Sequence, residues 1–348
     1  MHRHPAQAPD SERVRGLPGQ AALAWRAGAV TARRAGAAAA WPAEAVTAQP
    51  AGAAAAWRAG AVTAQPAGAV TAQPAGAAAA RRAGQARRDQ QSAQAIASVV
   101  CLHASASSGR QWQALGRRLA GRYRVLSPDL YGAGDSPPWP AERQPTLADE
   151  VALLEPVFEA AGEPVHLVGH SYGGAVAARA ALTYPGRFRS LVLIEPVLFG
   201  LLLAEDPGQP AAREVVAVCQ HTRIAVELGA LDGAARRFID YWMGPGAWAG
   251  MPPHRRAAAA RAMRTVSSEW SAIFAETTPL AAYASLDLPT LYVVGGKSPA
   301  STRAVARLLT QVLPDVSTAE LAEAGHMAPI THPDLVSAAI EAHIAQIT

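Results

Sequence analysis

The chain has 348 residues, of which 50% are hydrophobic, and carries 31 basic and 27 acidic side chains for a net charge of +4. The positive excess lies in residues 1–90, where 11 arginines face 4 acidic residues, whereas residues 91–348 carry 20 basic and 23 acidic side chains. A basic surface for nucleic acid is therefore not expected on the larger part of the chain. The longest apolar run, residues 191–204, is shorter than the ~20 residues that span a bilayer, so a membrane is not expected as a partner either. No apolar segment of a secretory signal is found at the amino terminus, which predicts a cytoplasmic location.

Residues 21–84 consist of eight octads, among them AVTAQPAG and AAAAWRAG. Such a segment has too few large apolar side chains to offset the entropy of an ordered chain. We interpret residues 1–92 as disordered, low-complexity sequence, with a functional tail as the alternative. Residues 93–348 are predicted to form the folded domain.

From residue 97 onward, short apolar runs alternate with helical patterns. Strands are predicted over residues 97–104, 123–130, 165–171, 190–196, 289–296 and 317–324. Helices are predicted over residues 108–121, 146–162, 172–184 and 301–314. Continuous apolar strands that alternate with helices are typical of an α/β fold, with a mostly parallel sheet covered on both faces. The alternation stops at about residues 197–285, where a helical pattern rich in aromatic residues predicts an inserted helical cap.

The decapeptide LVGHSYGGAV, residues 167–176, places a serine between glycines where a predicted strand meets a predicted helix. Gly169 and Gly173 allow the strand and the helix to approach closely, and the turn exposes the Ser171 hydroxyl at the carboxyl edge of the sheet. The helix that begins at Tyr172 points its first N–H groups toward the same place, which suits a negatively charged oxygen. This arrangement is typical of a nucleophilic serine.

A serine hydroxyl needs a general base to become a good nucleophile. His326, in the segment AGHMAP, follows the last predicted strand and precedes the final helix, so its loop can reach the sheet edge. Other histidines lie in the amino-terminal segment, in strands, in the serine turn or at a helix start: His2, His4, His103, His166, His170 and His332. By elimination His326 is the predicted base. His170 is expected to face away from the site.

Acyl transfer also needs two backbone donors for the developing oxyanion. One is the N–H of Tyr172, directly after the serine. The other is expected from the loop after the first strand, LHASASSG (102–109), with Ser105 as the best candidate.

Four motifs, LHASASSGRQW, PDLYGAGDS, GHSYGG and AGHMAP, occur in the order found in the α/β-hydrolase superfamily. The chain resembles that family over about residues 96–348. The resemblance implies an α/β-hydrolase fold with Ser171 as nucleophile, His326 as base, and Ser105 and Tyr172 as oxyanion donors. It also implies that Asp129 shapes a loop and takes no part in catalysis.

The chain departs from this family in three places. His103-Ala104 stands where His-Gly is common, and the repetitive segment before residue 95 leaves no sequence for the first two strands of the fold, so a shortened sheet is expected. The acid of most members follows the strand that corresponds to residues 289–296, where this chain has Ser298.

A minority of the family carries its acid at the end of the preceding strand, which here is Glu195. A glutamate that ends a buried strand needs a partner, because a buried charge without one is costly. We therefore predict that Glu195 orients His326. Glu205 or Asp206 as the acid, a serine–histidine dyad, and a Glu195 that only pairs with the cap remain alternatives.

Together these features predict a cofactor-independent serine hydrolase that cleaves an ester, lactone, thioester or related acyl bond of a small, largely apolar substrate. Epoxide hydrolases and dehalogenases of this fold use an aspartate nucleophile, which Ser171 disfavours. A C–C bond hydrolase or lyase, or a non-catalytic ligand-binding protein of the same fold, stays open. The sequence contains no metal-ligand cluster and no phosphate loop, so no cofactor or metal is expected.

Overall fold

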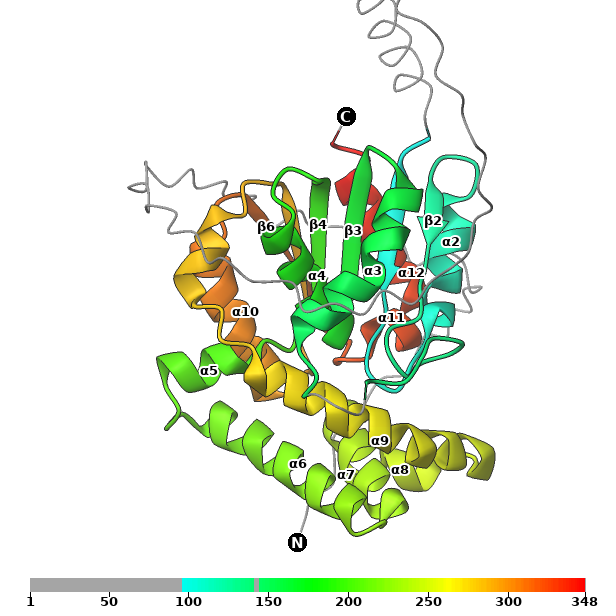
Figure 1. The fold of residues 1–348 in the computed structure, drawn as a ribbon, viewed down its shortest axis with the longest axis vertical. Coiled ribbons are helices and arrows are strands. Elements are labelled where there is room, and N and C mark those ends of the chain that lie inside the picture. The colour runs from blue at the N-terminus through cyan, green and yellow to red at the C-terminus, as the bar shows by residue number, and fades with distance from the viewer. Residues whose placement is uncertain (1–95, 141–143, 348) are drawn as a thin grey trace, which may run out of the picture. The chain divides into compact units, whose positions relative to one another are not determined.

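The computed structural model describes residues 96–140 and 144–347. The octads and the predicted boundary at residue 92 lie outside this part. The described chain forms a six-stranded sheet in the order β2-β1-β3-β4-β5-β6, and each neighbouring pair is parallel (Figure 1). The strands are β1 (Ser98–Leu102), β2 (Arg124–Leu126), β3 (Val165–His170), β4 (Phe188–Ile194), β5 (Thr290–Gly295) and β6 (Val316–Leu321).

Alternate residues of a strand point to opposite sides of the sheet. The strands carry apolar residues on both sides, and helices cover both faces. On one face, Val99 and Val168 pack in a core with residues of α2 and α12. On the other face, Val100 and Leu167 pack in a core with residues of α3, α4 and α10. These helices are α2 (Gln113–Leu119), α3 (Leu147–Ala161), α4 (Tyr172–Thr183), α10 (Ala300–Val312) and α12 (Pro333–Ile344), with the short turns η1 (Gly109–Trp112) and α11 (Ala328–Thr331).

A helical insert separates β4 from β5, as the interrupted sequence pattern predicts. It consists of α5 (Phe199–Glu205), α6 (Pro210–Glu227), α7 (Leu231–Met243), α8 (Ala247–Gly250), α9 (Pro253–Ala275) and η2 (Leu280–Ser285). Figure 1 shows α6, α7, α8 and α9 gathered beyond one end of the strands. We call α5–α9 the cap.

The parallel sheet with helices on both faces confirms the fold class. The described part of the chain forms a sheet of six strands, in agreement with the expected shortened sheet, and the residues before 96 lie outside the described part. One element differs clearly from its prediction, because β2 ends at Leu126 and the residues up to Leu130 form a loop. In this loop the Asp129 carboxylate accepts hydrogen bonds from the N–H groups of Gly109 (2.8 Å) and Asp135 (3.2 Å), so side-chain bonding replaces strand pairing there.

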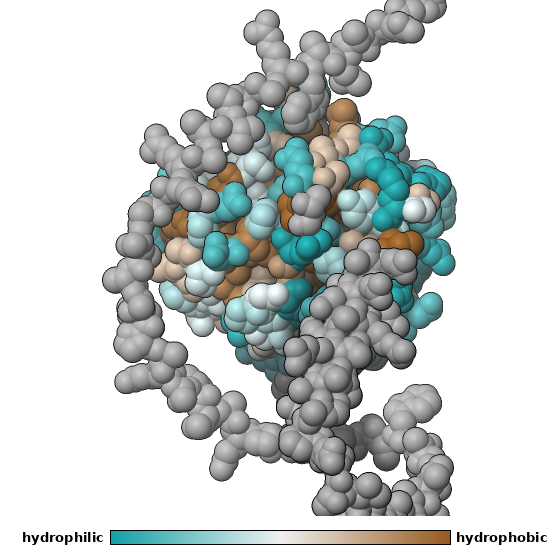
Figure 2. Space-filling view, turned by 90° about the horizontal axis from the view of Figure 1, so that it is seen from above, coloured by the Kyte–Doolittle hydropathy of each residue, from teal (hydrophilic) through white to brown (hydrophobic). Residues whose placement is uncertain are grey.

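Large apolar side chains at the surface of the described chain are few, and two of them, Ile224 and Leu228, lie one turn apart at the end of α6. Those exposed are Ile96, Ile224, Leu228, Met243, Ile330 and Leu335. In Figure 2 the coloured part of the visible face mixes hydrophilic and hydrophobic residues. A few exposed apolar residues of this kind are normal on a protein surface.

The strand order places the site. After β1 the chain adds β2 on one side and then places β3 on the other side of β1. Open parallel sheets bind ligands at such a reversal, outside the carboxyl ends of the strands. Here the reversal brings the loop after β1, which contains Ser105, beside the turn after β3, which contains Ser171.

Candidate active site

Ser171 lies on a strained turn between β3 and α4. Its φ is 56° and its ψ is −116°, and the helix begins at the next residue, Tyr172. A Cβ on Gly169 would come within 2.3 Å of the Gly173 carbonyl oxygen, and a Cβ on Gly173 within 2.4 Å of the Leu102 carbonyl oxygen. Both glycines are therefore needed for close backbone approach, as the sequence motif predicts.

This packing yields a stability prediction. Gly173→Ala should destabilise the protein by about 1–3 kcal/mol, the usual cost of forcing extra volume into a close-packed core. Gly116→Ala is the matched control, because Gly116 lies within helix α2 and its added Cβ would meet nothing within 4 Å. That control should be neutral or stabilising by up to ~1 kcal/mol. Urea denaturation of both variants measures the difference, and equal stabilities would contradict the packing argument.

The structure brings Ser171, His326 and Glu195 together. His326 Nε2 lies 2.9 Å from Ser171 Oγ, and His326 Nδ1 lies 2.6 Å from Glu195 Oε2. The side chains of His326 and Glu195 are each 1% exposed. A carboxylate only accepts hydrogen bonds, so Nδ1 carries the proton and Nε2 is left to accept from the serine hydroxyl.

Glu195 is held at the end of β4 by the neighbouring strand. Its Oε1 accepts a hydrogen bond of 2.7 Å from the N–H of Gly295, and its own N–H donates to the Val293 carbonyl at 3.1 Å. The alternative acids, Glu205 and Asp206, are exposed at the end of α5. Of the three carboxylates considered from the sequence, Glu195 is the one that contacts His326.

Three non-glycine residues in the described chain have positive φ: Ala106 (54°), Ser171 (56°) and Glu195 (43°). One lies in the loop after β1, and the other two belong to the hydrogen-bonded set. Strained residues of this kind cluster at functional sites, where the surrounding structure maintains them.

Of the two predicted oxyanion donors, Tyr172 directly follows Ser171, and Ser105 lines the same cavity as Ser171. In the described part of the chain, neither the N–H of Ser105 nor that of Tyr172 has a recorded acceptor. Gln111 braces the loop, because its Oε1 accepts from the Ala104 N–H at 3.1 Å. His103 does so too, because its Nε2 accepts from the Leu130 N–H at 3.0 Å and its Nδ1 donates to the Ala104 carbonyl at 2.8 Å. Burial lowers the pKa of His103, which keeps the ring neutral for this bonding.

His170 contributes to the site indirectly, contrary to the expectation that it faces away. The ring is buried, and its Nε2 donates to the His326 carbonyl oxygen at 2.8 Å. Gln111 Nε2 donates to its Nδ1 at 3.1 Å. Burial and the neighbouring His326 hold the pKa of His170 well below its usual range. Through Gln111, His170 thus links the loop after β1 to the backbone of His326. The sequence did not indicate this role, because His170 occupies a position of the serine motif that accepts any residue.

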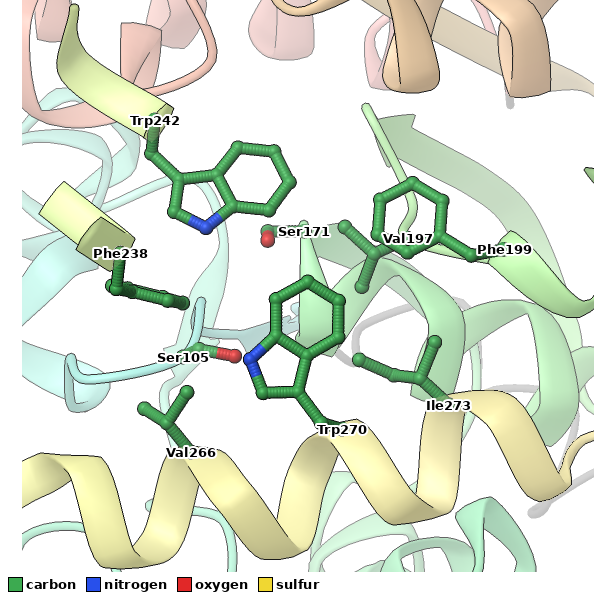
Figure 3. A pocket seen from close by; sticks show the side chains of 9 residues that line it. All are labelled: Ser105, Ser171, Val197, Phe199, Phe238, Trp242, Val266, Trp270 and Ile273. Atoms are coloured by element: carbon green, nitrogen blue, oxygen red, sulfur yellow. The ribbon is translucent and has the colours of Figure 1, made fainter. Parts of the chain in front are cut away.

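The cap closes over Ser171. The Trp242 ring stacks on the His326 ring, with centroids 4.1 Å apart and planes 29° apart. The cavity that remains has a volume of about 10 Å³, near the space of one water molecule. It is lined by Ser105, Ser171, Val197, Phe199, Phe238, Trp242, Val266, Trp270 and Ile273 (Figure 3). A substrate therefore needs the cap side chains to move before it reaches the serine.

No group of three or more His, Cys, Asp or Glu side chains is arranged to hold a metal ion in residues 96–140 and 144–347. In the same residues no helix combines the length and the apolar character needed to cross a bilayer.

The Alpha/beta hydrolase family matches residues 99–339, and the chain belongs to this family. A pimeloyl-[acyl-carrier protein] methyl ester esterase of Aeromonas hydrophila is 36% identical over 119 residues, which are 32% of this chain and 42% of the esterase. The lipase LipV of Mycobacterium tuberculosis is 36% identical over 106 residues, which are 29% of this chain and 38% of the lipase. The chain thus spans less than half the length of either relative.

Solved structures share the fold at low sequence identity. MGS-M2, an alpha/beta hydrolase enzyme from a Medee basin deep-sea metagenome library, has a TM-score of 0.62 and 18% identity, over 73% of this chain and 91% of that chain. The esterase EaEST from Exiguobacterium antarcticum has a TM-score of 0.58 and 17% identity, over 72% and 92%. The chain is an alpha/beta hydrolase whose distant relatives include esterases and lipases.

Proposed function

We propose that the protein is a serine hydrolase that cleaves an ester or a related acyl bond through an acyl-enzyme. The observation that carries the proposal is the continuous hydrogen-bonded series from Glu195 through His326 to the hydroxyl of Ser171. The serine occupies a strained turn at the carboxyl edge of the sheet, where a nucleophile is accessible to a ligand once the cap moves. The similarity to an esterase and a lipase supports the same reaction class.

In the first half of the reaction, Ser171 Oγ attacks the carbonyl carbon while its proton passes to His326 Nε2. The carbonyl oxygen becomes an oxyanion, which accepts hydrogen bonds from the N–H groups of Ser105 and Tyr172. Glu195 stabilises the positive charge on the imidazolium. The C–O bond then breaks, and the leaving alcohol takes the proton from Nε2.

In the second half, water gives a proton to His326 Nε2 and attacks the acyl-enzyme. The second tetrahedral intermediate collapses, Ser171 recovers its proton, and the acid leaves. These steps use only water, side chains and backbone N–H groups of the chain. The apolar cavity wall favours a small, largely apolar substrate.

A fluorophosphonate probe tests the proposal on the whole protein. Intact mass should rise by one phosphonyl group, peptide mapping should place the group on Ser171, and p-nitrophenyl butyrate hydrolysis should stop in proportion to labelling. Heat-denatured protein is the control, because labelling requires the assembled site. Labelling on another residue, or none on folded protein, would reject Ser171 as the nucleophile.

A further inference from the structure

Two polar side chains, Ser105 and Trp270, line the otherwise apolar cavity, and a third, Glu269, precedes Trp270 on α9. Ser105 lines the cavity, and its hydroxyl lies close enough to the carboxyl group of Glu269 to lower the pKa of that group. Trp270 also lines the cavity, and Figure 3 shows its indole nitrogen turned toward the Ser105 side chain. Glu269 lies three residues after Val266 on α9, so it shares the helix face that presents Val266 and Trp270.

Two atoms of this group are buried without a protein partner. Glu269 is 1% exposed and Trp270 is 2% exposed. Neither Glu269 Oε2 nor Trp270 Nε1 has a hydrogen-bond partner among the residues that the structure describes. Buried polar atoms in folded proteins are rarely left unpaired. Trp270 Nε1 is thus an unpaired donor in the cavity wall, and Glu269 Oε2 is an unpaired oxygen at the preceding position of α9. Together they indicate a place for a ligand group.

The electrostatic surroundings suit a neutral ligand group better than a charged one. Burial raises the pKa of Glu269 to about 7, against the nearby Ser105 hydroxyl, which lowers it. Burial, with the charges of Glu269 and Asp149, also raises the pKa of the nearby Glu150 carboxyl to about 8, against hydrogen bonds from Tyr131 and Tyr172 that lower it. Glu150 Oε1 accepts a 3.1 Å hydrogen bond from the Tyr172 hydroxyl. Near neutral pH these carboxyls retain part of their protons, which limits the attraction for a cation.

We propose that Ser105, Glu269 and Trp270 form a polar subsite that binds a hydroxyl group of the substrate, close to the scissile ester. This inference rests on the proposed function. A hydroxyl group both accepts and donates hydrogen bonds. The Trp270 N–H therefore donates to the hydroxyl oxygen, and the hydroxyl O–H donates to Glu269 Oε2.

The test compares esters that differ only by hydroxyl against methyl. Methyl lactate is paired with methyl isobutyrate, and methyl β-hydroxybutyrate with methyl isovalerate, to place the hydroxyl in the acyl part. Hydroxyethyl butyrate is paired with propyl butyrate to place it in the alcohol part. We expect kcat/KM for the hydroxy ester to exceed that of its partner by about tenfold or more in one pair, because a site built for a hydroxyl rejects the analogue that lacks it.

Variants then assign the preference to the subsite. Trp270→Phe removes the N–H and keeps an aromatic ring, and Glu269→Leu removes the acceptor, so each should bring the hydroxy-to-methyl ratio of kcat/KM toward one. Glu269→Gln keeps an acceptor oxygen and should retain much of the ratio. Trp248→Phe on α8 and Glu214→Gln on α6 are the matched controls, and neither should change the ratio.

Binding separates this inference from the proposed reaction. Calorimetric titration of the same ester pairs into Ser171→Ala protein measures hydroxyl recognition without turnover. If no ester is hydrolysed but the hydroxy ester binds more tightly, the reaction assignment fails and the subsite stands. Equal binding and equal kcat/KM within every pair would overturn the subsite, as would a preference that survives in both Trp270→Phe and Glu269→Leu.

Discussion

Alanine in place of Ser171 should lower kcat on p-nitrophenyl butyrate by about 10⁶-fold, the scale seen when the serine of a triad is removed. The reason is chemical, because the oxygen that attacks the ester is gone while the oxyanion donors and the cavity remain. The fold should be unaffected, since Ser171 Oγ hydrogen-bonds His326 and the backbone hydrogen bonds of Ser171 do not depend on the hydroxyl.

Steady-state kinetics with a melting curve for each protein measures this effect. Ser285→Ala replaces an exposed serine of η2 and serves as the control, with activity equal to that of the wild type. Near-normal turnover in Ser171→Ala at an unchanged melting temperature would remove Ser171 from the mechanism.

Glu195→Gln should lower kcat by about 10⁴-fold, the loss measured when the acid of a serine protease triad becomes an amide. The amide preserves the shape but removes the charge that stabilises the imidazolium. It can also donate to Nδ1, which favours the wrong tautomer of His326. Glu205→Gln, at an exposed position at the end of α5, is the matched control and should behave like the wild type. If Glu195→Gln lowers kcat as little as the control Glu205→Gln does, a serine–histidine dyad is favoured.

A carboxylate introduced at Ser298 provides a second test of the role of Glu195. Ser298 is 5% exposed, follows β5, and has no hydrogen-bond partner for its Oγ in the described chain. It lies next to Gly295, the residue whose N–H holds Glu195. Ser298→Asp combined with Glu195→Gln should therefore recover part of the lost kcat. The single variant Ser298→Asp is the control, because it shows whether a second carboxylate disturbs the intact site. If kcat does not recover in the double variant, the introduced carboxylate does not reach His326.

Much of the fold was predictable because its strands are short continuous apolar runs between helical patterns. Strand β3 and helix α4 follow from the residues around Ser171, where two glycines mark the tight turn. Strand β2 was predicted too long, because residues 123–130 have a strand-like composition. The loop after β2 is held by the Asp129 carboxylate and the His103 ring, which accept hydrogen bonds from N–H groups distant in sequence. Such bonds do not affect the hydrophobic pattern from which strands are predicted.

The candidate site was predictable where its residues follow strands. Ser171, Glu195 and the Ser105 loop each come directly after an apolar run, so a parallel sheet places them at one edge. Residues of the cap were not predictable in this way. Trp242 and Glu269 lie on amphipathic helices, and which of their neighbours they meet depends on how the insert docks on the sheet.

The near absence of free volume above Ser171 has a consequence for affinity. If only an open form admits substrate, the measured dissociation constant equals the intrinsic one divided by the fraction of molecules that are open. Side chains that hold the cap shut then weaken every ligand by the same factor, whatever its chemistry. Replacing a cap residue such as Trp242 changes the fraction of open molecules as well as the contact with His326. The ratio of affinities for two matched ligands therefore describes the pocket better than either absolute affinity does.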